Sequence, residues 1–209
     1  MKRLAILGAS GHGKVVAEIA ELSGWADIVF FDDACSKIKK IGIWAVLGNT
    51  TDLLDRISEF DGCIVAIGNN TIRLEKSCLI QRNKGNLVSL VHPCSIVSRL
   101  SEVGLGSVVM AGAVINPFVK LGVACVVNTI ASIDHDCILG DGVHISPGVN
   151  LAGGVILGQK SWVGIGASVK QCVSIGDNVI VGAGAAVISN VPNELVVAGV
   201  PAKVISRNI

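Results

Sequence analysis

From Val91 to Pro192 an apolar residue recurs every six positions without a break. The stretch divides into seventeen hexads, and the first residue of each is Val, Ile or Leu. The fifth residue is always Ser, Ala, Val or Cys, as at Ser95, Cys125 and Val191. A period of six fits neither the helical repeat of about 3.6 residues nor a hairpin meander. The pattern predicts a parallel β-helix, in which each hexad forms a short strand and a corner and three hexads complete a triangular coil.

In such a β-helix the first and fifth positions point inward, and a small fifth residue lets the coils pack closely. Cys125 and Cys137 occupy fifth positions and are therefore predicted core residues. Glycine recurs at the second position, where we expect corners that need unusual backbone dihedral angles. The glycines at this position include Gly104, Gly122, Gly140, Gly158, Gly164, Gly176 and Gly182.

The residues before the hexads alternate between short apolar runs and segments with helical spacing. Strands are predicted within residues 2–8, 26–33, 62–70 and 87–93. Helices are predicted over residues 15–24, 51–60 and 71–85, the second with Thr51 as its N-cap. This alternation predicts a small, mostly parallel, Rossmann-like sheet covered on both sides. We therefore expect an α/β Rossmann-like domain over residues 1–90 and an all-β parallel β-helix domain over residues 91–209.

Three candidate binding segments follow predicted strands, at the edge where sheets of this kind bind ligands. They are G-A-S-G-H-G-K over residues 8–14, Asp32 with Asp33, and residues 68–70. The first has Walker A spacing, but Val15 stands where Ser or Thr would hold magnesium, and its glycines lack the dinucleotide-binding spacing.

The glycine segment still predicts a phosphate site, because glycines let N–H groups at a helix N-terminus approach an anion. His12 and Lys14 would add donors or charge. A tight turn without a ligand is the alternative. Asp32 is placed to accept hydrogen bonds from a ribose or base, and a solvated turn carboxylate is the alternative for it.

Composition narrows the classes of partner. The net charge is +1, with no basic stripe for nucleic acid and no run of about twenty apolar residues for a membrane span. The start, MKRLAILGASGHG, predicts a β-strand rather than a secretion signal. The seven cysteines suit a reducing compartment and show no metal-ligand spacing. We expect a cytoplasmic protein without a metal.

The hexad region is poor in charge. Only seven residues between Val103 and Pro192 are charged, and the mean hydropathy of the chain is +0.66. Much of the outward surface must be apolar, which indicates a subunit interface where no membrane segment is expected. We predict a homo-oligomer, a trimer with its prisms side by side.

His135 occupies the third position of its hexad, between Asp134 and Asp136. An outward histidine has a pocket only if another subunit supplies one, so the predicted interface is also the natural catalytic cleft. Residues eighteen apart stack on successive coils, which places the backbone N–H of Gly153 near the imidazole. Acyl transfer requires this pairing of a base with an N–H donor. A surface or interface histidine without chemistry is the alternative.

The hexads, together with G-A-S-G-H-G-K, F-D-D, A-I-G-N-N, N-T-I-A-S-I-D-H-D-C and G-V-P-A-K, resemble the left-handed β-helix acyltransferases. Within them, the chain is most similar to the sialic acid O-acetyltransferase branch, which includes N-acetyltransferases of nucleotide-linked 4-amino-4,6-dideoxy sugars. The resemblance covers nearly the whole chain. It implies a left-handed coil, a homotrimer, and acetyl-CoA bound between adjacent prisms.

The resemblance also implies roles for individual residues. His135 matches the catalytic base and Asp136 the acid that orients it, although neighbours along a strand point to opposite faces, so the pattern alone leaves that orienting role open. Cofactor contacts are implied for Asn128, His144, Gly153, Pro201, Ala202 and Lys203. The resemblance places the nucleotide sugar against Gly11, His12, Lys14, Asp33, Gly68 and Asn69. Asp32 is added to this set because of its position after the second predicted strand.

We therefore interpret the chain as an acetyl-CoA-dependent N-acetyltransferase acting on the amine of a nucleotide-linked 4-amino-4,6-dideoxy sugar, in bacterial surface-glycan biosynthesis. The N-terminal domain would hold the nucleotide and present the sugar. No Ser or Cys nucleophile is evident, so we expect direct transfer in a ternary complex. Two alternatives stay open: an O-acetyltransferase acting on sialic acid or another sugar hydroxyl, and a non-catalytic trimeric scaffold.

Overall fold

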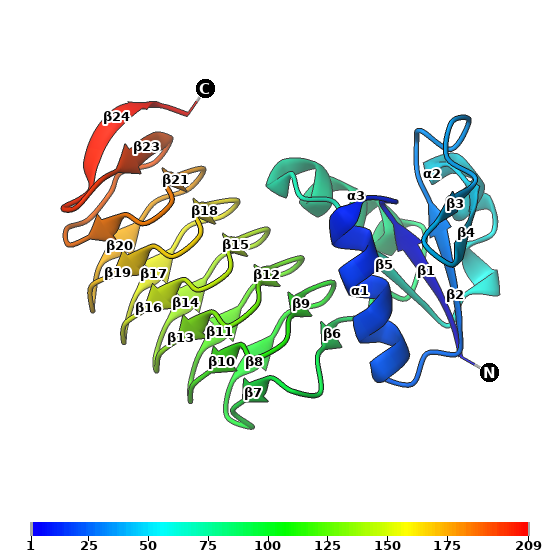
Figure 1. Ribbon diagram of the computed structural model, residues 1–209, viewed down its shortest axis with the longest axis horizontal. Helices are drawn as coiled ribbons and strands as arrows, with labels where there is room; N and C mark the ends of the chain where they lie inside the picture. The colour runs from blue at the N-terminus through cyan, green and yellow to red at the C-terminus, as the bar shows by residue number, and fades with distance from the viewer. Residues whose placement is uncertain (1, 209) are drawn as a thin grey trace. The chain divides into compact units, whose positions relative to one another are not determined.

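The structure is a computed structural model that describes residues 2–208. The chain divides into two compact units, Met1–Pro93 and Cys94–Ile209. The first unit contains an α/β sheet with its helices, and the second is a stack of short strands (Figure 1).

The N-terminal unit consists of alternating strands and helices. They are β1 (Arg3–Leu7), α1 (Gly11–Leu22), β2 (Asp27–Phe31), β3 (Lys40–Ile41), β4 (Trp44–Gly48), α2 (Thr50–Asp55), a 3₁₀ turn (Ile57–Glu59), β5 (Gly62–Val65), α3 (Asn70–Arg82) and β6 (Leu90–Val91). The sheet has the order β3-β4-β2-β1-β5 and is parallel except for the β3-β4 pair. The predicted, mostly parallel sheet is confirmed.

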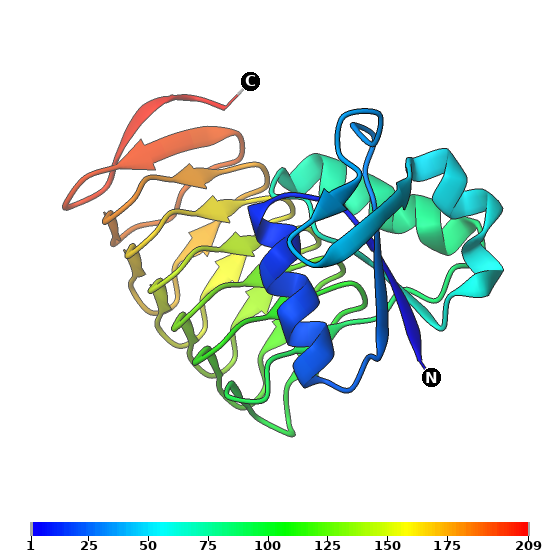
Figure 2. The same cartoon turned by 45° about the vertical axis from the view of Figure 1, so that its right-hand side comes forward.

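The sheet is covered on both faces because its connections run in two directions. The chain crosses from β1 to β2 through α1, and returns from β4 to β5 on the far side of β1 through α2. Right-handed crossovers in opposite directions place these two helices on opposite faces. Figure 2 shows α1 in front of the strands. The central strand β1 is accordingly apolar and buried from Leu4 to Leu7.

Two predicted helix starts are wrong. The first helix begins at Gly11 rather than Val15, so the second half of the glycine segment forms its first turn. The second helix is capped by Asn49, not by Thr51. Asn49 Oδ1 accepts the N–H of Asp52 at 3.0 Å, and the Asp52 carboxylate accepts the N–H of Asn49 at 2.8 Å. This reciprocal capping box outcompetes a single hydroxyl cap.

The second unit is a parallel β-helix with three faces (Figure 1). The first face carries β7 (Ile96–Val97), β10 (Val114–Ile115), β13 (Ser132–Ile133), β16 (Asn150–Leu151), β19 (Ser168–Val169) and β22 (Ala186–Val187). The second carries β8 (Glu102–Val103), β11 (Lys120–Leu121), β14 (Ile138–Leu139), β17 (Ile156–Leu157) and β20 (Ser174–Ile175). The third carries β9 (Val108–Val109), β12 (Val126–Val127), β15 (His144–Ile145), β18 (Trp162–Val163), β21 (Ile180–Val181), β23 (Leu195–Ala198) and β24 (Lys203–Arg207).

Strand register confirms the predicted stacking of residues eighteen apart. Ser132 pairs with Val114 on one side and with Asn150 on the other, and the same interval holds on all three faces. First and fifth positions form the core, in which Ile133 and Cys137 are fully buried. The pair β23 and β24 is antiparallel and follows the last coil.

The second-position glycines have a different cause from the predicted one. Unusual backbone angles occur instead at the fourth position, where φ is positive in every hexad from Gly106 to Gly184. At Gly140 a Cβ atom would approach the backbone nitrogen of Gln159 to 2.8 Å, and at Gly104 it would collide with the carbonyl of Gly122. Where the second position holds glycine, the reason is that successive coils touch there, not that the backbone is left-handed.

Candidate active site

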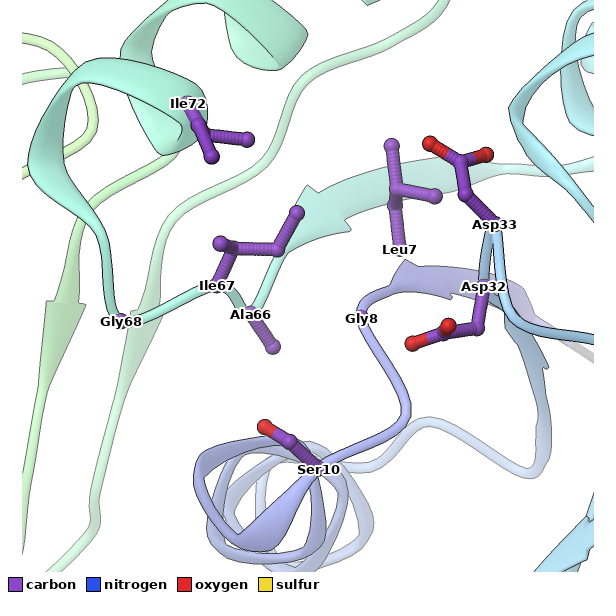
Figure 3. A pocket seen from close by; sticks show the side chains of 9 residues that line it. All are labelled: Leu7, Gly8, Ser10, Asp32, Asp33, Ala66, Ile67, Gly68 and Ile72. Atoms are coloured by element: carbon purple, nitrogen blue, oxygen red, sulfur yellow. The ribbon is translucent and has the colours of Figure 1, made fainter. Parts of the chain in front are cut away.

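A pocket of about 350 Å³ opens at the ends of β1, β2 and β5 in the N-terminal unit (Figure 3). It lies where the strand order reverses around β1, the usual ligand position in such sheets. Its lining comprises Leu7, Gly8, Ser10, Asp32, Asp33, Ala66, Ile67, Gly68 and Ile72. The carboxylates lie on one side of the pocket, and the side chains of Ile67 and Ile72 on the other.

Both carboxylates in this pocket are held by the protein. Asp32 accepts the N–H of Ala9 at 2.7 Å and the N–H of Ala34 at 2.8 Å. Asp33 accepts the N–H of Thr50 and the ammonium of Lys76, both at 2.9 Å. Burial works against the charged form of Asp33, but these hydrogen bonds and the Lys76 charge outweigh it and lower the pKa to about 2. Asp32 therefore shapes the glycine turn, and Asp33 stays ionised.

His12 does not supply the charge that the glycine segment suggests. Burial, with a contribution from the Arg73 charge, lowers its pKa to about 4, so the ring is neutral at pH 7. Its Nε2 is buried and has no partner within residues 2–208. The helix turn that carries it packs tightly, because a Cβ atom at Gly13 would collide with the Gly8 carbonyl and approach the Phe30 ring to 2.9 Å.

The other predicted sugar-site residues fall outside the pocket lining. Gly11 begins α1, and Lys14 is exposed beside a different hollow that contains Ile43 and Trp44. Asn69 caps α3 by accepting the N–H of Ile72 at 3.0 Å. The structure therefore brings Asp32, Asp33 and Gly68 together around one pocket and leaves Lys14 apart from them.

The β-helix carries a second hollow, of about 540 Å³, around His135. The ring Nδ1 lies 2.7 Å from Asp136 Oδ2. The two residues sit in a corner, where Asp136 has φ of +60°, rather than along a strand. The rule that strand neighbours face opposite ways therefore does not apply, and the two side chains meet. The Asp136 hydrogen bond, followed by the Asp134 charge, raises the pKa of His135.

Gly153 stacks against the His135 ring, one coil further along the β-helix. A Cβ atom at this position would lie 2.6 Å from Cε1 and 2.7 Å from Nε2, so the ring can hold this position only beside a glycine. Its N–H has no acceptor among the residues that the structure describes. A base and an available N–H donor thus line the same hollow, as acyl transfer requires.

The remaining predicted cofactor contacts lie elsewhere on the β-helix. Asn128 Nδ2 is 3.5 Å from His144 Nε2, and the His144 ring stacks on Trp162 with centroids 5.1 Å apart. The predicted contacts Pro201, Ala202 and Lys203 occupy the turn between β23 and β24 and the start of β24. Ala202 is tied to the last coil through its N–H, which donates to the Ala186 carbonyl at 2.8 Å.

Within residues 2–208, no group of three or more His, Cys, Asp or Glu side chains is placed to hold a metal ion. Over the same range, no helix has the length and apolar character that a membrane span needs.

The family model that matches is that of the PglD N-terminal domain, over residues 3–78. A curated relative, UDP-N-acetylbacillosamine N-acetyltransferase of Bacillus subtilis, is 36% identical over 113 residues. The match covers 53% of this chain and 52% of the relative, so the chain spans about half of that enzyme's length.

Solved structures match over almost the full length. The acetyltransferase domain of PglB from Neisseria gonorrhoeae, in complex with acetyl coenzyme A, is 41% identical with a TM-score of 0.93, over 98% of this chain and 99% of that one. PerB from Caulobacter crescentus, in complex with CoA and GDP-perosamine, is 34% identical with a TM-score of 0.94, over 99% and 98%. The chain belongs to the PglD-like hexapeptide-repeat acetyltransferases. The resemblance seen in its motifs is thereby confirmed, as is the fold class of a Rossmann-like domain followed by a left-handed β-helix.

Two residues of this PglD-like chain were missed by the sequence reasoning. Arg73 is 1% exposed and donates to the carbonyls of Ile67 and Gly68, both at 3.1 Å, so it holds the loop that forms one wall of the N-terminal pocket. A single arginine among the polar residues of a helix gave no signal of this role.

Cys172 was the other omission, because it lines the hollow around His135. Its position two coils beyond Asp136, thirty-six residues later, could have revealed this placement. The Cys172 Sγ lies 4.0 Å from the Gly153 carbonyl oxygen and makes no hydrogen bond to His135 within the described chain.

Proposed function

We propose that this PglD-like chain transfers the acetyl group of acetyl-CoA to the amine of a nucleotide-linked 4-amino-4,6-dideoxy sugar, in bacterial surface-glycan biosynthesis. The observation that carries the proposal is the pairing of His135 with Asp136 on one side and Gly153 on the other. Because the Asp136 carboxylate accepts a hydrogen bond from Nδ1–H, Nε2 is left as the acceptor that faces Gly153 and the hollow.

His135 acts as the general base in the proposed reaction. The amine nitrogen forms a bond to the thioester carbonyl carbon while Nε2 of His135 takes the amine proton. The Gly153 N–H stabilises the negative charge that develops on the carbonyl oxygen. The carbon–sulfur bond then breaks, and His135 returns the proton to the sulfur of the departing thiol.

Acetyl-CoA is assigned to the β-helix. Structures of PglB and PerB in complex with acetyl-CoA or CoA support the identity of the cofactor. The hollow of about 540 Å³ beside Gly153 supports its placement. Asn128, His144 and the segment from Pro201 to Lys203 stay as proposed contacts of the cofactor.

The nucleotide is assigned to the pocket at the ends of β1, β2 and β5. PerB binds a GDP-linked amino sugar, and the Bacillus subtilis relative is named for a UDP-linked one. The pocket has a polar side, at Asp32 and Asp33, and an apolar side, at Ile67 and Ile72, as a ribose joined to a flat base requires. Of the other predicted sugar contacts, neutral His12 and the first turn of α1 would act through backbone N–H groups.

A homotrimer in the cytoplasm is part of the proposal. Large apolar side chains of the β-helix are more than half exposed, among them Ile96, Phe118, Ile130 and Ile165. Such a surface favours burial against further copies of the chain. Within residues 2–208 none of the seven cysteines is placed in a disulfide bond, which suits a reducing compartment.

Initial rates of thiol release from acetyl-CoA test the proposed function. The acceptors are UDP-, dTDP- and GDP-linked 4-amino-4,6-dideoxy sugars, with sialic acid as the alternative acceptor. We expect turnover with at least one nucleotide sugar and a fall of about 10² to 10⁴ in rate for His135→Ala. No turnover with any nucleotide sugar, or a His135→Ala variant that keeps most of its activity, rejects the proposal; turnover of sialic acid alone supports the O-acetyltransferase instead.

A further inference from the structure

Asp134 makes two hydrogen bonds through one carboxylate oxygen. Its Oδ1 accepts the backbone N–H of His135 at 2.8 Å and the Nδ2–H of Asn116 at 2.9 Å. Asn116 lies eighteen residues earlier, at the matching position of the preceding coil. The side chain that contacts the backbone of the histidine is thus itself tied to a second coil.

The residue types at the second hexad position differ between the corner that carries His135 and the corner that follows the second face of the β-helix. There the second positions of successive coils are all glycine, at Gly104, Gly122, Gly140, Gly158 and Gly176. Beside the base, the second positions hold Asn116 and Asp134, and the next coil has Ala152. Of these two linked polar side chains, Asp134 directly precedes the histidine in the chain.

We infer that Asp134 is a positioning residue for His135: held by Asn116, its carboxylate fixes the backbone of the turn from which the imidazole projects. This inference rests on the proposed role of His135 as the base. The His135 side chain is 59% exposed, so packing alone does not fix it. Asp134 holds its backbone, and Asp136 holds Nδ1 of its ring.

The charge of Asp134 has a second effect, because it is the largest contribution after the Asp136 hydrogen bond to the raised pKa of His135. The charged side chains lining the hollow are Asp134 and Asp136, both from the histidine's own turn. The coils further along contribute Gly153, Gly154, Gln171 and the thiol of Cys172, and Asn116 approaches from the coil before. Removing the Asp134 charge should therefore lower the pKa of His135.

The test compares three variants with one control in the full-length protein. Asp134→Ala removes the carboxylate, Asp134→Asn keeps an oxygen that can accept the His135 N–H, and Asn116→Ala frees the carboxylate. The control is Asp177→Ala, which removes an aspartate that accepts the Gln159 N–H at 2.7 Å in another corner. The readouts are kcat and KM against pH, the melting temperature, and the pKa of His135 by NMR titration.

We expect Asp134→Ala to lower kcat by about 10- to 100-fold at every pH, with KM for the sugar little changed, because the base is displaced. Asn116→Ala should lower kcat less. Asp134→Asn should recover most of kcat at high pH and shift the acid limb of the profile, with the NMR pKa of His135, to lower pH. Asp177→Ala should leave kcat and the His135 pKa unchanged.

A folded Asp134→Ala variant with wild-type kcat overturns the inference, as does an Asp134→Asn variant with an unchanged His135 pKa. Equal losses of kcat in Asp134→Ala and Asp177→Ala would show a general effect on the β-helix and also overturn it. If the wild type is inactive, or His135→Ala retains turnover, the proposed function fails, a result distinct from these. The NMR titration needs no substrate, so it decides the charge effect in either case.

Discussion

At the scale of single residues, the position of a side chain in its corner decides its chemistry. His135 and Asp136 are chain neighbours that a strand would point apart, yet the left-handed φ of Asp136 turns the two side chains together. The sequence indicated His135 and Gly153 through their spacing of eighteen residues. The repeat pattern alone could not indicate the Asp136 contact, because the dihedral angles of a corner do not follow from an alternation rule. Only the family resemblance implied it.

His12 shows the converse, a residue whose type suggests charge and whose surroundings remove it. Its pKa of about 4 lies below the ordinary value of 6.5, chiefly because the ring is buried. The unfolded chain therefore binds a proton more readily than the native one, and stability is lost as pH falls from about 6.5 toward 4. We expect His12 to contribute about 3 kcal/mol to this loss.

Hydrogen exchange of β1 and α1 between pH 7 and 4, corrected for the intrinsic rates, measures this loss locally. His12→Gln removes the titrating group and should flatten the pH dependence of the local unfolding free energy. If the local unfolding free energy depended on pH equally in the variant and the wild type, that result would contradict the neutral, buried state of His12.

Cys172 allows a test of direct transfer, because it is the nucleophilic thiol that lines the hollow around His135. It has no hydrogen bond to His135 within the described residues, so no base activates it. We expect Cys172→Ala to keep kcat within about threefold of wild type. We also expect no acetylated protein by mass spectrometry after incubation with acetyl-CoA alone. A loss like that of His135→Ala, or an acetyl group on Cys172, would instead indicate a covalent intermediate.

At the scale of elements, the hexad combines two separate steric requirements. Glycines at the second position lie against the next coil, whereas fourth positions adopt positive φ even at Phe118 and Ile130. A residue in the left-handed region costs about 1–2 kcal/mol. Hydrogen bonds between coils offset this cost, because the N–H of the fourth residue donates to a carbonyl of the preceding coil, as from Asp136 to Pro117. The sequence revealed the repeat through its core, but fourth positions vary too much in residue type to reveal their conformation.

Two alanine substitutions separate these requirements. Gly140→Ala places a Cβ 2.8 Å from the backbone nitrogen of Gln159. The two coils cannot move apart to make room without breaking the register of their paired strands. Gly166→Ala has open space around its Cβ but φ of +68°. We expect Gly140→Ala to cost about 2–4 kcal/mol and Gly166→Ala about 1 kcal/mol. Gly166→Asn should cost less than Gly166→Ala, because asparagine tolerates the left-handed region.

Thermal unfolding at one protein concentration and one heating rate ranks the three glycine variants. A melting temperature for Gly140→Ala equal to that of the wild type would show that the coils can separate enough for a methyl group. It would then contradict the close approach of the backbones as the reason for glycine at the second position.

At the scale of the whole molecule, the sequence predicted the fold class and the family because both depend on repeated local patterns. The lining of the N-terminal pocket depends on tertiary placement and was predicted only in part. Asp32, Asp33 and Gly68 line the pocket, but Lys14 points to a separate hollow because its helix begins four residues earlier than predicted. Helix boundaries are set by capping competition over a few residues, which sequence patterns determine poorly.

Identification of the acetylated atom tests the central claim, His135-dependent transfer of acetyl to a sugar amine, most directly. The product of each UDP-, dTDP- and GDP-linked 4-amino-4,6-dideoxy sugar is isolated and examined by NMR, then treated with hydroxylamine, which cleaves esters and spares amides. We predict a hydroxylamine-resistant amide on the 4-amino group with at least one of these sugars, and almost none with His135→Ala. A hydroxylamine-labile ester, or an amide formed equally by His135→Ala, would contradict the claim.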